Sequence, residues 1–577
     1  MSAAARVPMA IRLPAWRARV ALIGLLAAFL VLAGRSAYLQ SMKTGFLQEK
    51  GEARYSRVLE IPGTRGRILD RHGEALAIST PVKSIWAIPE DVKAGPGQMR
   101  SLAALLGQDA RELERRIAGT ERDFVYLKRQ LPPETAAQVA QLGIPGIHQH
   151  SEFRRYYPGG ETVAHVIGFT GVNDAGQEGI ELAHQQDLAG VAGSRRVIKD
   201  RLGRVVEDVE SIRGAQNGKD LMLALDGKIQ SLAFTTLKNA IAANKAKAGA
   251  VVVLDVKTGE VLALANWPTY NPNNRARLTG AQLRNRVVTD TFEPGSTLKP
   301  FTMALALNTG RVTPQTVIPT PGAVLKMGGF TIKDTHKANS VTALQAIQWS
   351  SNVALAKTAL GMPREEMHGM FRDVGFGAPP RLGFPGEAGG RLREAKTWKP
   401  VEQATMAYGH GISVSLLQLA RAYSVFARDG DMVPLSLLKV VSGEPQATRV
   451  FSAATARTMR EMLEAAVQPG GTAPRARIAG WRVAGKTGTA HKQENGGYAA
   501  NKYVSSFVGF APVSAPRLVI AVMIDEPGAG QHYGGAVAAP IFGQVMQGAL
   551  RLLAVPHDAP LTPIELPAAM PEVLEET

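Results

Sequence analysis

Cysteine is absent from this chain of 577 residues. Its absence excludes disulfide bonds, thiol nucleophiles and thiolate metal sites, although it does not decide the compartment. Two other catalytic signatures are missing as well. The zinc-binding pattern H-E-x-x-H does not occur, and neither does the G-x-S-x-G turn of many serine hydrolases. The sequence therefore gives no support to a zinc hydrolase or to a local Ser-His-Asp triad.

Basic clusters interleaved with aromatic residues are also missing, although the formal net charge is +17. The Lys and Arg residues are spread along the chain, and aromatic residues make up only 6% of it. A basic composition without a recognisable binding module is weak evidence for nucleic acid, so we expect no nucleic-acid partner. Solubility, or attraction to an anionic cell wall, explains the charge equally well.

Long apolar runs are rare, and the one near the amino terminus is preceded by four arginines: Arg6, Arg12, Arg17 and Arg19. The uncharged stretch 20–34 continues with a helical pattern to Leu39, which gives about 20 residues, enough to cross a bilayer. Because basic residues favour the cytoplasmic side, we expect a cytoplasmic tail at 1–19, a transmembrane anchor at 20–39 and the remainder outside the cytoplasm. The alternative is a signal peptide cleaved after Ala33, and the length of the helix favours the anchor.

The rest of the chain is long enough for two or more domains, and 45% of all residues are hydrophobic, as in folded proteins. Residues 55–225 contain short strand-like runs, glycines and charged turns, a pattern typical of a non-catalytic pedestal domain. Within this domain we predict strands at 58–61 and 84–88 and helices at 112–117 and 133–142.

Residues 226–555 have the pattern of an α+β domain that begins with an amphipathic helix at 228–244. Five strands are predicted at 250–255, 261–265, 481–484, 504–510 and 518–525. A tight turn at 257–260 joins the first two strands, and the mostly helical segment 296–466 separates them from the last three. We therefore predict an antiparallel five-stranded sheet with a helical insertion.

The carboxyl end carries five prolines among acidic residues: Pro556, Pro560, Pro563, Pro567 and Pro571. Such a composition does not form a regular element. We predict a flexible tail at 556–577.

The first candidate for chemistry is Ser296, at the predicted start of an apolar helix, with Lys299 one turn further on. Residues three apart share a helix face, and the helix start offers free N–H groups and positive potential. A lysine shielded from water beside other cations can lose its proton and serve as a base. Taken alone, a serine and a lysine at this spacing are more often a helix cap and a solvated charge.

The second candidate is Ser350-Ser351-Asn352, where polar residues stand between apolar ones. A tight turn between two buried helices would point the Ser350 hydroxyl and the Asn352 amide into a cleft. Taken alone, this motif too is more often a helix cap.

The third candidate is Lys486-Thr487-Gly488-Thr489, which follows the predicted strand 481–484 at a sheet edge. An extended peptide could add to that edge as another strand, and Gly488 would let its backbone approach closely. Residues 480–487 also match the phosphate-loop pattern G-x-x-x-x-G-K-T, which requires a helix directly afterwards. Because residues 488–497 read as a loop, we disfavour a nucleotide site.

The three candidates occur in one order that is typical of serine β-lactamases and penicillin-binding proteins, with Ser-Ser-Asn in place of Ser-Asp-Asn. Further stretches resemble the class B penicillin-binding proteins, most of all the septal, FtsI-type transpeptidases, and the resemblance covers nearly the whole chain. They include residues 65–73 (RGRILDRHG), 155–158 (RYYP), 293–296 (EPGS) and 533–535 (YGG). One departure is His410, where relatives often carry an aromatic residue. Without the resemblance, the Arg-Asp pairs would be read as solvated charges and the glycine-rich stretches as surface turns.

The resemblance implies a serine-type D-Ala-D-Ala transpeptidase or carboxypeptidase. Ser296 would attack the D-Ala–D-Ala bond of a peptidoglycan stem peptide, and Lys299 would take its proton. Ser350, helped by Lys486, would relay a proton to the departing D-alanine. Neither a metal nor an organic cofactor is implied.

The same resemblance assigns substrate contacts to Asn352 and to Thr487, Gly488 and Thr489. Asn352 would hold the donor peptide, and the two threonines would hold its carboxylate. The backbone N–H groups of Ser296 and Thr489 would stabilise the oxyanion. β-Lactams should acylate Ser296 and inhibit the enzyme.

The expected setting is the inner membrane, with one membrane-spanning segment and the catalytic domain in the periplasm. The expected partners are a membrane glycosyltransferase of the FtsW type and other cell-division proteins. Three alternatives remain open: an elongation-type transpeptidase, a β-lactam sensor or β-lactamase on the same fold, and an inactive scaffold.

Overall fold

The computed structural model of the chain describes residues 14–41, 56–119, 124–199, 205–441, 443, 445–494, 497–562 and 564. The amino-terminal helix α1 (Ala15–Ser41) is longer than the predicted span 20–39. Its segment Ala15–Gln40 is long and apolar enough to cross a membrane, and none of it is buried by the rest of the protein. Apolar side chains such as Phe29 are therefore exposed in the isolated chain.

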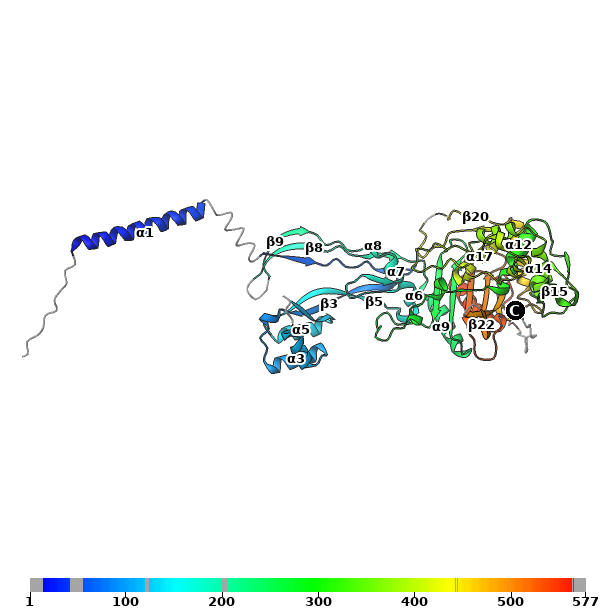
Figure 1. Ribbon diagram of the computed structural model, residues 1–577, viewed down its shortest axis with the longest axis horizontal. Helices are drawn as coiled ribbons and strands as arrows, with labels where there is room; N and C mark the ends of the chain where they lie inside the picture. Colours follow the sequence, from blue (N-terminus) through cyan, green and yellow to red (C-terminus); the bar gives the residue numbers. More distant parts are fainter. Residues whose placement is uncertain are drawn as a thin grey trace, which may run out of the picture.

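The pedestal is built on the strand β3 (Ala75–Ala87), which pairs antiparallel with β5 (Ile147–Tyr156) along most of its length. The predicted strand 84–88 is the end of β3. A separate antiparallel sheet contains β1 (Ser56–Ile61), β8 (Gly193–Lys199) and β9 (Val205–Arg213). In Figure 1 the long strands of the pedestal run toward the carboxy-terminal domain.

A small helical head lies at the other end of the pedestal (Figure 1). Its helices are α3 (Pro96–Leu106), α4 (Ala110–Ala118) and α5 (Pro133–Gln141). They share an apolar core with the strand β4 (Val125–Leu131). The predictions of helices at 112–117 and 133–142 are confirmed, whereas α3 was not predicted.

Two arginines of the pedestal, Arg65 and Arg155, are buried around one carboxylate. Arg65 Nε donates to Glu181 Oε2 at 2.5 Å, and Arg155 Nε donates to Glu181 Oε1 at 2.6 Å. Glu181 has no exposed surface, and both arginines are almost fully buried. For Arg65 the reading as a solvated charge is wrong, because Glu181 is distant in sequence and becomes its neighbour only in the folded pedestal. Such a buried cluster depends on every charge being paired.

The carboxy-terminal domain contains the predicted antiparallel five-stranded sheet, in the order β12-β11-β23-β22-β21. Its strands are β11 (Ala248–Asp255), β12 (Val261–Trp267), β21 (Ala484–Glu494), β22 (Gly497–Ala511) and β23 (Leu518–Asp525). Strand β21 lies at one edge. Every residue of β11 is buried, because both faces of the sheet are covered.

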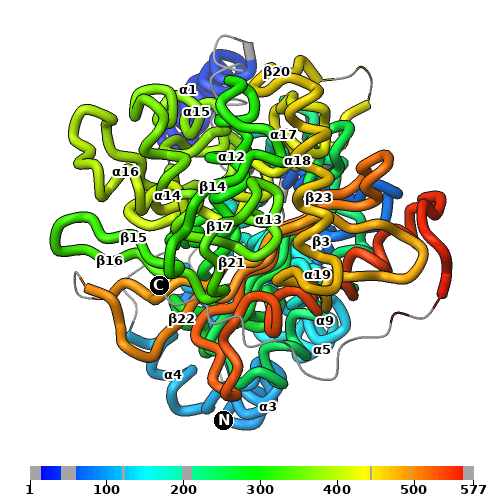
Figure 2. The backbone as a smooth tube through the Cα atoms, turned by 90° about the vertical axis from the view of Figure 1, so that its right-hand side faces the viewer, coloured from blue at the N-terminus to red at the C-terminus, as the bar shows by residue number. Residues whose placement is uncertain are grey.

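Two sets of helices cover the two faces, as the end-on view in Figure 2 shows. The helices α9 (Gly227–Ala243) and α19 (Gly534–Leu552) share one core with Val251 and Val253. The inserted helices α12 (Lys299–Asn308) and α17 (Leu416–Ala427) share the other core with Ala250 and Val252. Alternate residues of β11 thus face opposite cores, as the pleat of a strand requires. The helical insertion is confirmed.

Strand β21 differs from its prediction. It begins at Ala484, where the predicted strand ended, and continues through the predicted loop as far as Glu494, paired antiparallel with β22. The polar, glycine-containing sequence suggested a loop, yet pairing with β22, for example Ala490 with Val504, keeps it extended. Because no helix follows Lys486, the phosphate-loop alternative is wrong.

The beginning of the carboxyl tail is bound to the domain rather than flexible. Trp481 Nε1 donates to the carbonyl of Pro556 at 3.0 Å. The backbone N–H of Gly480 donates to the carbonyl of Pro560 at 3.1 Å. The backbone N–H of Arg482 donates to Asp558 Oδ1 at 2.7 Å. The flexible-tail prediction is wrong for these residues, and 565–577 lie outside the described part of the chain.

Candidate active site

Ser296 lies on a buried turn that leads directly into α12. The turn η3 (Gly295–Leu298) is a 3-10 helix, and Pro300 follows within the first turn of α12, where a missing N–H costs no helical bond. Gly295 has φ +54°, a conformation that favours glycine. Only 7% of Ser296 is exposed, so its hydroxyl is nearly buried rather than on an open surface.

The side chains of Ser296, Ser350 and Lys299 form one hydrogen-bonded chain. The Ser350 hydroxyl donates to Ser296 Oγ at 3.0 Å. Lys299 Nζ donates to Ser350 Oγ at 2.8 Å and to the Ser350 carbonyl at 2.5 Å. Lys299 is fully buried. A hydroxyl joined to a buried amine in this way has the geometry of a nucleophile with its base, which suits acyl transfer.

Ser350 lies between α13 (Ala343–Gln348) and α14 (Asn352–Leu360), on the tight turn that the sequence predicted. Its φ of +62° is left-handed, an uncommon conformation for serine that this turn has to maintain. Asn352 begins α14, and its Nδ2 donates to the Lys333 carbonyl at 3.2 Å. The Asn352 amide is thereby held at the side of the Ser350 turn.

Asp334 holds this turn in place, and sequence reasoning missed it. Its Oδ1 accepts from the backbone N–H groups of Asn352 at 2.6 Å and Val353 at 2.9 Å. Its Oδ2 accepts from the Ser351 hydroxyl at 2.5 Å. A carboxylate at a helix start is stabilised by the free N–H groups and the helix dipole. In the Ser-Asp-Asn motif the middle residue carries a carboxylate. Here the middle residue is Ser351, and the carboxylate beside the turn comes from Asp334, outside the motif.

Strand β21 brings the third motif against the turn of Ser296. A Cβ atom built on Gly488 would lie 2.7 Å from the Pro294 carbonyl oxygen and 2.9 Å from Thr297 Cγ2. Close packing on the turn of Ser296 therefore requires glycine at residue 488. Lys486 projects from the same face of the strand as Gly488, since alternate residues share a face.

Lys486 is fully buried, and its Nζ donates to Thr487 Oγ1 at 3.2 Å. The Thr487 hydroxyl donates to Thr472 Oγ1 at 3.1 Å. Thr489 Oγ1 accepts from the backbone N–H of Gly534 at 3.0 Å, so its own proton stays available for an acceptor. The hydroxyls of Thr487 and Thr489 are thus both oriented by protein contacts.

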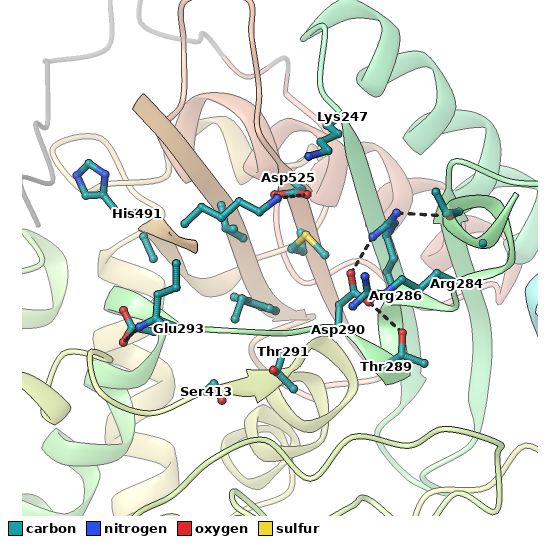
Figure 3. A pocket seen from close by; sticks show the side chains of 18 residues that line it. Lys247, Arg284, Arg286, Thr289, Asp290, Thr291, Glu293, Ser413, His491 and Asp525 are labelled. Carbon is teal, nitrogen blue, oxygen red and sulfur yellow. Dashed lines mark hydrogen bonds and ion pairs between the residues drawn. The ribbon is translucent and has the colours of Figure 1, made fainter. Parts of the chain in front are cut away.

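A cavity of about 610 Å³ lies next to this site but does not contain it. Figure 3 shows Glu293 and His491 at one side of the cavity and Arg284, Arg286 and Asp290 at the other. Its lining includes neither Ser296 nor Lys486. The hydrogen-bonded chain, and not the volume of a cavity, therefore identifies the candidate active site. Among the described residues, no group of three or more His, Asp or Glu side chains could hold a metal ion.

Comparisons with known proteins point to one family. The transpeptidase domain of penicillin-binding proteins matches residues 249–547, and the penicillin-binding protein dimerisation domain matches residues 60–223. The chain is 43% identical over 538 residues to the probable peptidoglycan D,D-transpeptidase PenA of Neisseria gonorrhoeae, covering 92% of each chain. It is 42% identical over 553 residues to the peptidoglycan D,D-transpeptidase FtsI of Escherichia coli, covering 94% of this chain and 93% of that one.

Solved structures agree with these matches. The penicillin-binding protein 3 of Mycobacterium tuberculosis, solved with aztreonam, aligns with a TM-score of 0.68 and 28% identity, covering 87% of this chain and 99% of that one. The transpeptidase domain of Burkholderia pseudomallei penicillin-binding protein 3 aligns with a TM-score of 0.55 and 47% identity. The alignment covers 59% of this chain and 98% of that one. Both domains of the chain therefore have relatives of the same architecture.

Proposed function

The chain belongs to the penicillin-binding protein family of peptidoglycan D,D-transpeptidases, and we propose that Ser296 is the nucleophile through which it cross-links stem peptides. The observation that carries this proposal is the hydrogen-bonded chain from Ser296 through Ser350 to Lys299. It joins two of the three motifs in one buried cluster, and β21 brings the third motif against the same turn.

Acylation begins when Lys299, as the neutral amine, takes the proton of the Ser296 hydroxyl. Ser296 Oγ then attacks the carbonyl carbon of the penultimate D-alanine, and a tetrahedral oxyanion forms. The backbone N–H groups of Ser296 and Thr489 stabilise it, each contributing about 3–4 kcal/mol in comparable sites. The packing of Gly295 supports this pairing, since a Cβ atom on Gly295 would lie 3.1 Å from the Thr489 carbonyl oxygen.

The intermediate collapses when the C–N bond to the terminal D-alanine breaks. The Ser350 hydroxyl passes a proton to the departing amine and is reprotonated from Lys299, and the charge of Lys486 favours this transfer. The acyl group remains on Ser296 Oγ. An amine of a neighbouring stem peptide then attacks the ester, forms the cross-link and releases Ser296. Attack by water instead would give carboxypeptidase activity.

The donor peptide lies along the free edge of β21, where an extended chain can add as a further strand. The Asn352 amide holds its backbone. The hydroxyl of Thr489, and that of Thr487 once its proton turns away from Thr472 Oγ1, bind the terminal carboxylate of the peptide. Gly488 contributes by letting the strand pack on the turn of Ser296. β-Lactams acylate the same serine and inhibit the enzyme.

The test uses the full chain in detergent with a stem peptide ending in D-Ala-D-Ala and a D-amino acid as acceptor. We expect one D-alanine to be released for each acceptor amine incorporated, plus D-alanine from any hydrolysis. Pre-incubation with a penicillin should abolish both products. A folded chain that releases no D-alanine from any such peptide, and takes up no penicillin, would refute the proposal.

Asp334→Ala should slow acylation about tenfold and lower the free energy of unfolding by about 1–2 kcal/mol, because α14 loses its cap and the Ser350 turn its support. Asp373→Ala, at an exposed position on α15 (Arg364–Asp373), is the matched control and should change neither quantity. Stopped-flow acylation by a chromogenic β-lactam and chemical denaturation measure the two effects. An unchanged acylation rate in Asp334→Ala would mean that the turn keeps its conformation without the carboxylate.

The cellular setting is also a proposal. Helix α1 anchors the chain in the inner membrane, with Arg17 and Arg19 at its cytoplasmic end and the catalytic domain in the periplasm. Similarity to proteins named FtsI supports a role in septal synthesis with a glycosyltransferase of the FtsW type and other division proteins. A periplasm-compatible fluorescent fusion should gather at mid-cell. Fluorescence along the flanks would instead indicate the elongation role.

A further inference from the structure

Glu293 is a buried carboxylate three residues before Ser296 that the mechanism above does not use. Only 6% of it is exposed. Its Oε1 accepts from the backbone N–H of Gly411 at 2.8 Å and from Gln493 Nε2 at 2.8 Å. Its Oε2 accepts from the Tyr498 hydroxyl at 2.9 Å and lies 3.4 Å from His410 Nδ1. The Glu293 carboxylate therefore accepts hydrogen bonds from several donors.

These donors come from separate elements of the carboxy-terminal domain. Gln493 and Tyr498 lie opposite each other near the end of the β21–β22 hairpin. His410 and Gly411 belong to a turn whose residue Gly409 accepts a hydrogen bond from the backbone N–H of Gly295 at 3.2 Å. Glu293 thus joins the segment of Ser296 to the hairpin on one side and to the 409–411 turn on the other.

The ionised form of the Glu293 carboxyl group suits these hydrogen bonds. Burial alone would raise its pKa, but the hydrogen bond and charge of His410, the Gly411 N–H and the Tyr498 hydroxyl together bring the pKa below its ordinary value. Burial and the Glu293 charge in turn raise the pKa of Tyr498 to about 12, so the phenol keeps its proton at neutral pH. Glu293→Gln would keep the shape but replace one accepting oxygen by an N–H₂ group, so at least one of these contacts would be lost or reversed.

The position of these contacts suggests their role. Glu293 lies three residues before Ser296, and Gln493 lies four residues after Thr489. Their hydrogen bond therefore connects the two segments that carry the proposed oxyanion donors. A shift of one segment against the other would weaken the donors in the transition state more than it would weaken ground-state binding.

We propose that Glu293 is a positioning residue that fixes the spacing between the backbone N–H groups of Ser296 and Thr489 by holding the β21–β22 hairpin and the 409–411 turn against the turn of Ser296. This inference rests on the proposed function of Ser296. It assigns Glu293 no contact with the reacting atoms.

The experiment measures acylation of the full chain by a chromogenic β-lactam and separates the binding constant from the rate constant of the chemical step. Glu293→Gln should lower the rate constant about tenfold and leave the binding constant within about twofold. Tyr498→Phe removes one donor and should lower the rate constant about threefold. The double variant should be no slower than Glu293→Gln alone, because both changes break the same contact. Glu366→Gln, which changes an exposed glutamate paired with Arg311, is the matched control and should behave as wild type.

Tyr498→Phe and Gln493→Ala change the partly exposed hairpin and provide the test if Glu293→Gln does not fold. The inference is overturned if Glu293→Gln acylates within twofold of wild type, if its loss lies in binding alone, or if the two losses multiply in the double variant. In each of these cases the wild-type chain is still acylated, and the proposed function stands. A wild-type chain that no β-lactam acylates would overturn the proposed function and this inference together.

Discussion

The Ser296→Ala chain is expected to take up no fluorescent penicillin and to release no D-alanine from a stem peptide. The substitution removes the only hydroxyl that the account makes a nucleophile. Ser350, although 3.0 Å away, is already bonded to Lys299 and lies on a turn fixed by Asp334. Gel fluorescence after labelling, together with amino-acid analysis of the released D-alanine, measures the loss.

The fold should survive this change. Loss of one hydrogen bond from a buried serine costs about 1 kcal/mol, so the unfolding transition should move little. Ser340→Ala, at an exposed position on β17 (Ser340–Thr342), is the matched control and should label as wild type. A Ser296→Ala chain that is labelled as strongly as the control would remove Ser296 from its role.

Lys299→Met should slow acylation by about a thousandfold or more while the protein stays folded. Methionine has a similar volume but has no amine, so the Ser296 proton loses its acceptor, and positioned bases typically contribute 10²–10⁴-fold. The Ser350 carbonyl loses its donor, which should cost about 1–3 kcal/mol of stability without unfolding the chain. The acylation rate constant and the unfolding midpoint, measured on the same preparation, separate catalysis from stability.

Lys357→Met provides the control for this experiment. Lys357 lies on α14, and its Nζ donates to the carbonyl of Pro319 at the surface, away from the Ser296 hydroxyl. Its loss should leave acylation unchanged. If Lys299→Met acylates within tenfold of the control, another group must take the proton, and the proposed role of Lys299 is wrong.

The sheet, the insertion and the order of the three motifs could be predicted because each leaves a local pattern in the sequence. Strand β11 is a run of apolar residues, the apolar helix after Ser296 is unmistakable, and Ser350 stands between apolar helices. The sequence predicted the tight turn at Ser350 from this contrast alone. What the motifs do chemically had to be taken from their conjunction and from a family resemblance.

The supporting contacts could not be predicted, because their partners are distant in sequence. In the sequence Asp334 is an acidic residue with no distinguishing pattern. Only the fold places it at the start of α14. In the sequence Glu293 is a charged residue before a turn. Its partners Gly411 and Gln493 are 118 and 200 residues away. Buried Arg65 was read as a solvated charge for the same reason.

Strand β21 was misread for a different reason. Its sequence after Gly485 is polar and contains glycine, which favours a loop when the segment is considered alone. Its extended conformation comes from pairing with β22, and glycine at 488 comes from close packing against the turn of Ser296. Tertiary contacts here outweigh local preference, as they often do in strands.

The most direct test of the central claim is to locate the acyl group on the wild-type chain. After reaction with a penicillin and digestion with trypsin, mass spectrometry should find the added mass on the peptide 287–311, which contains Ser296 and the uncleaved Lys299-Pro300 bond. Fragmentation should assign the added mass to Ser296. An adduct on any other residue of a folded chain would contradict the account.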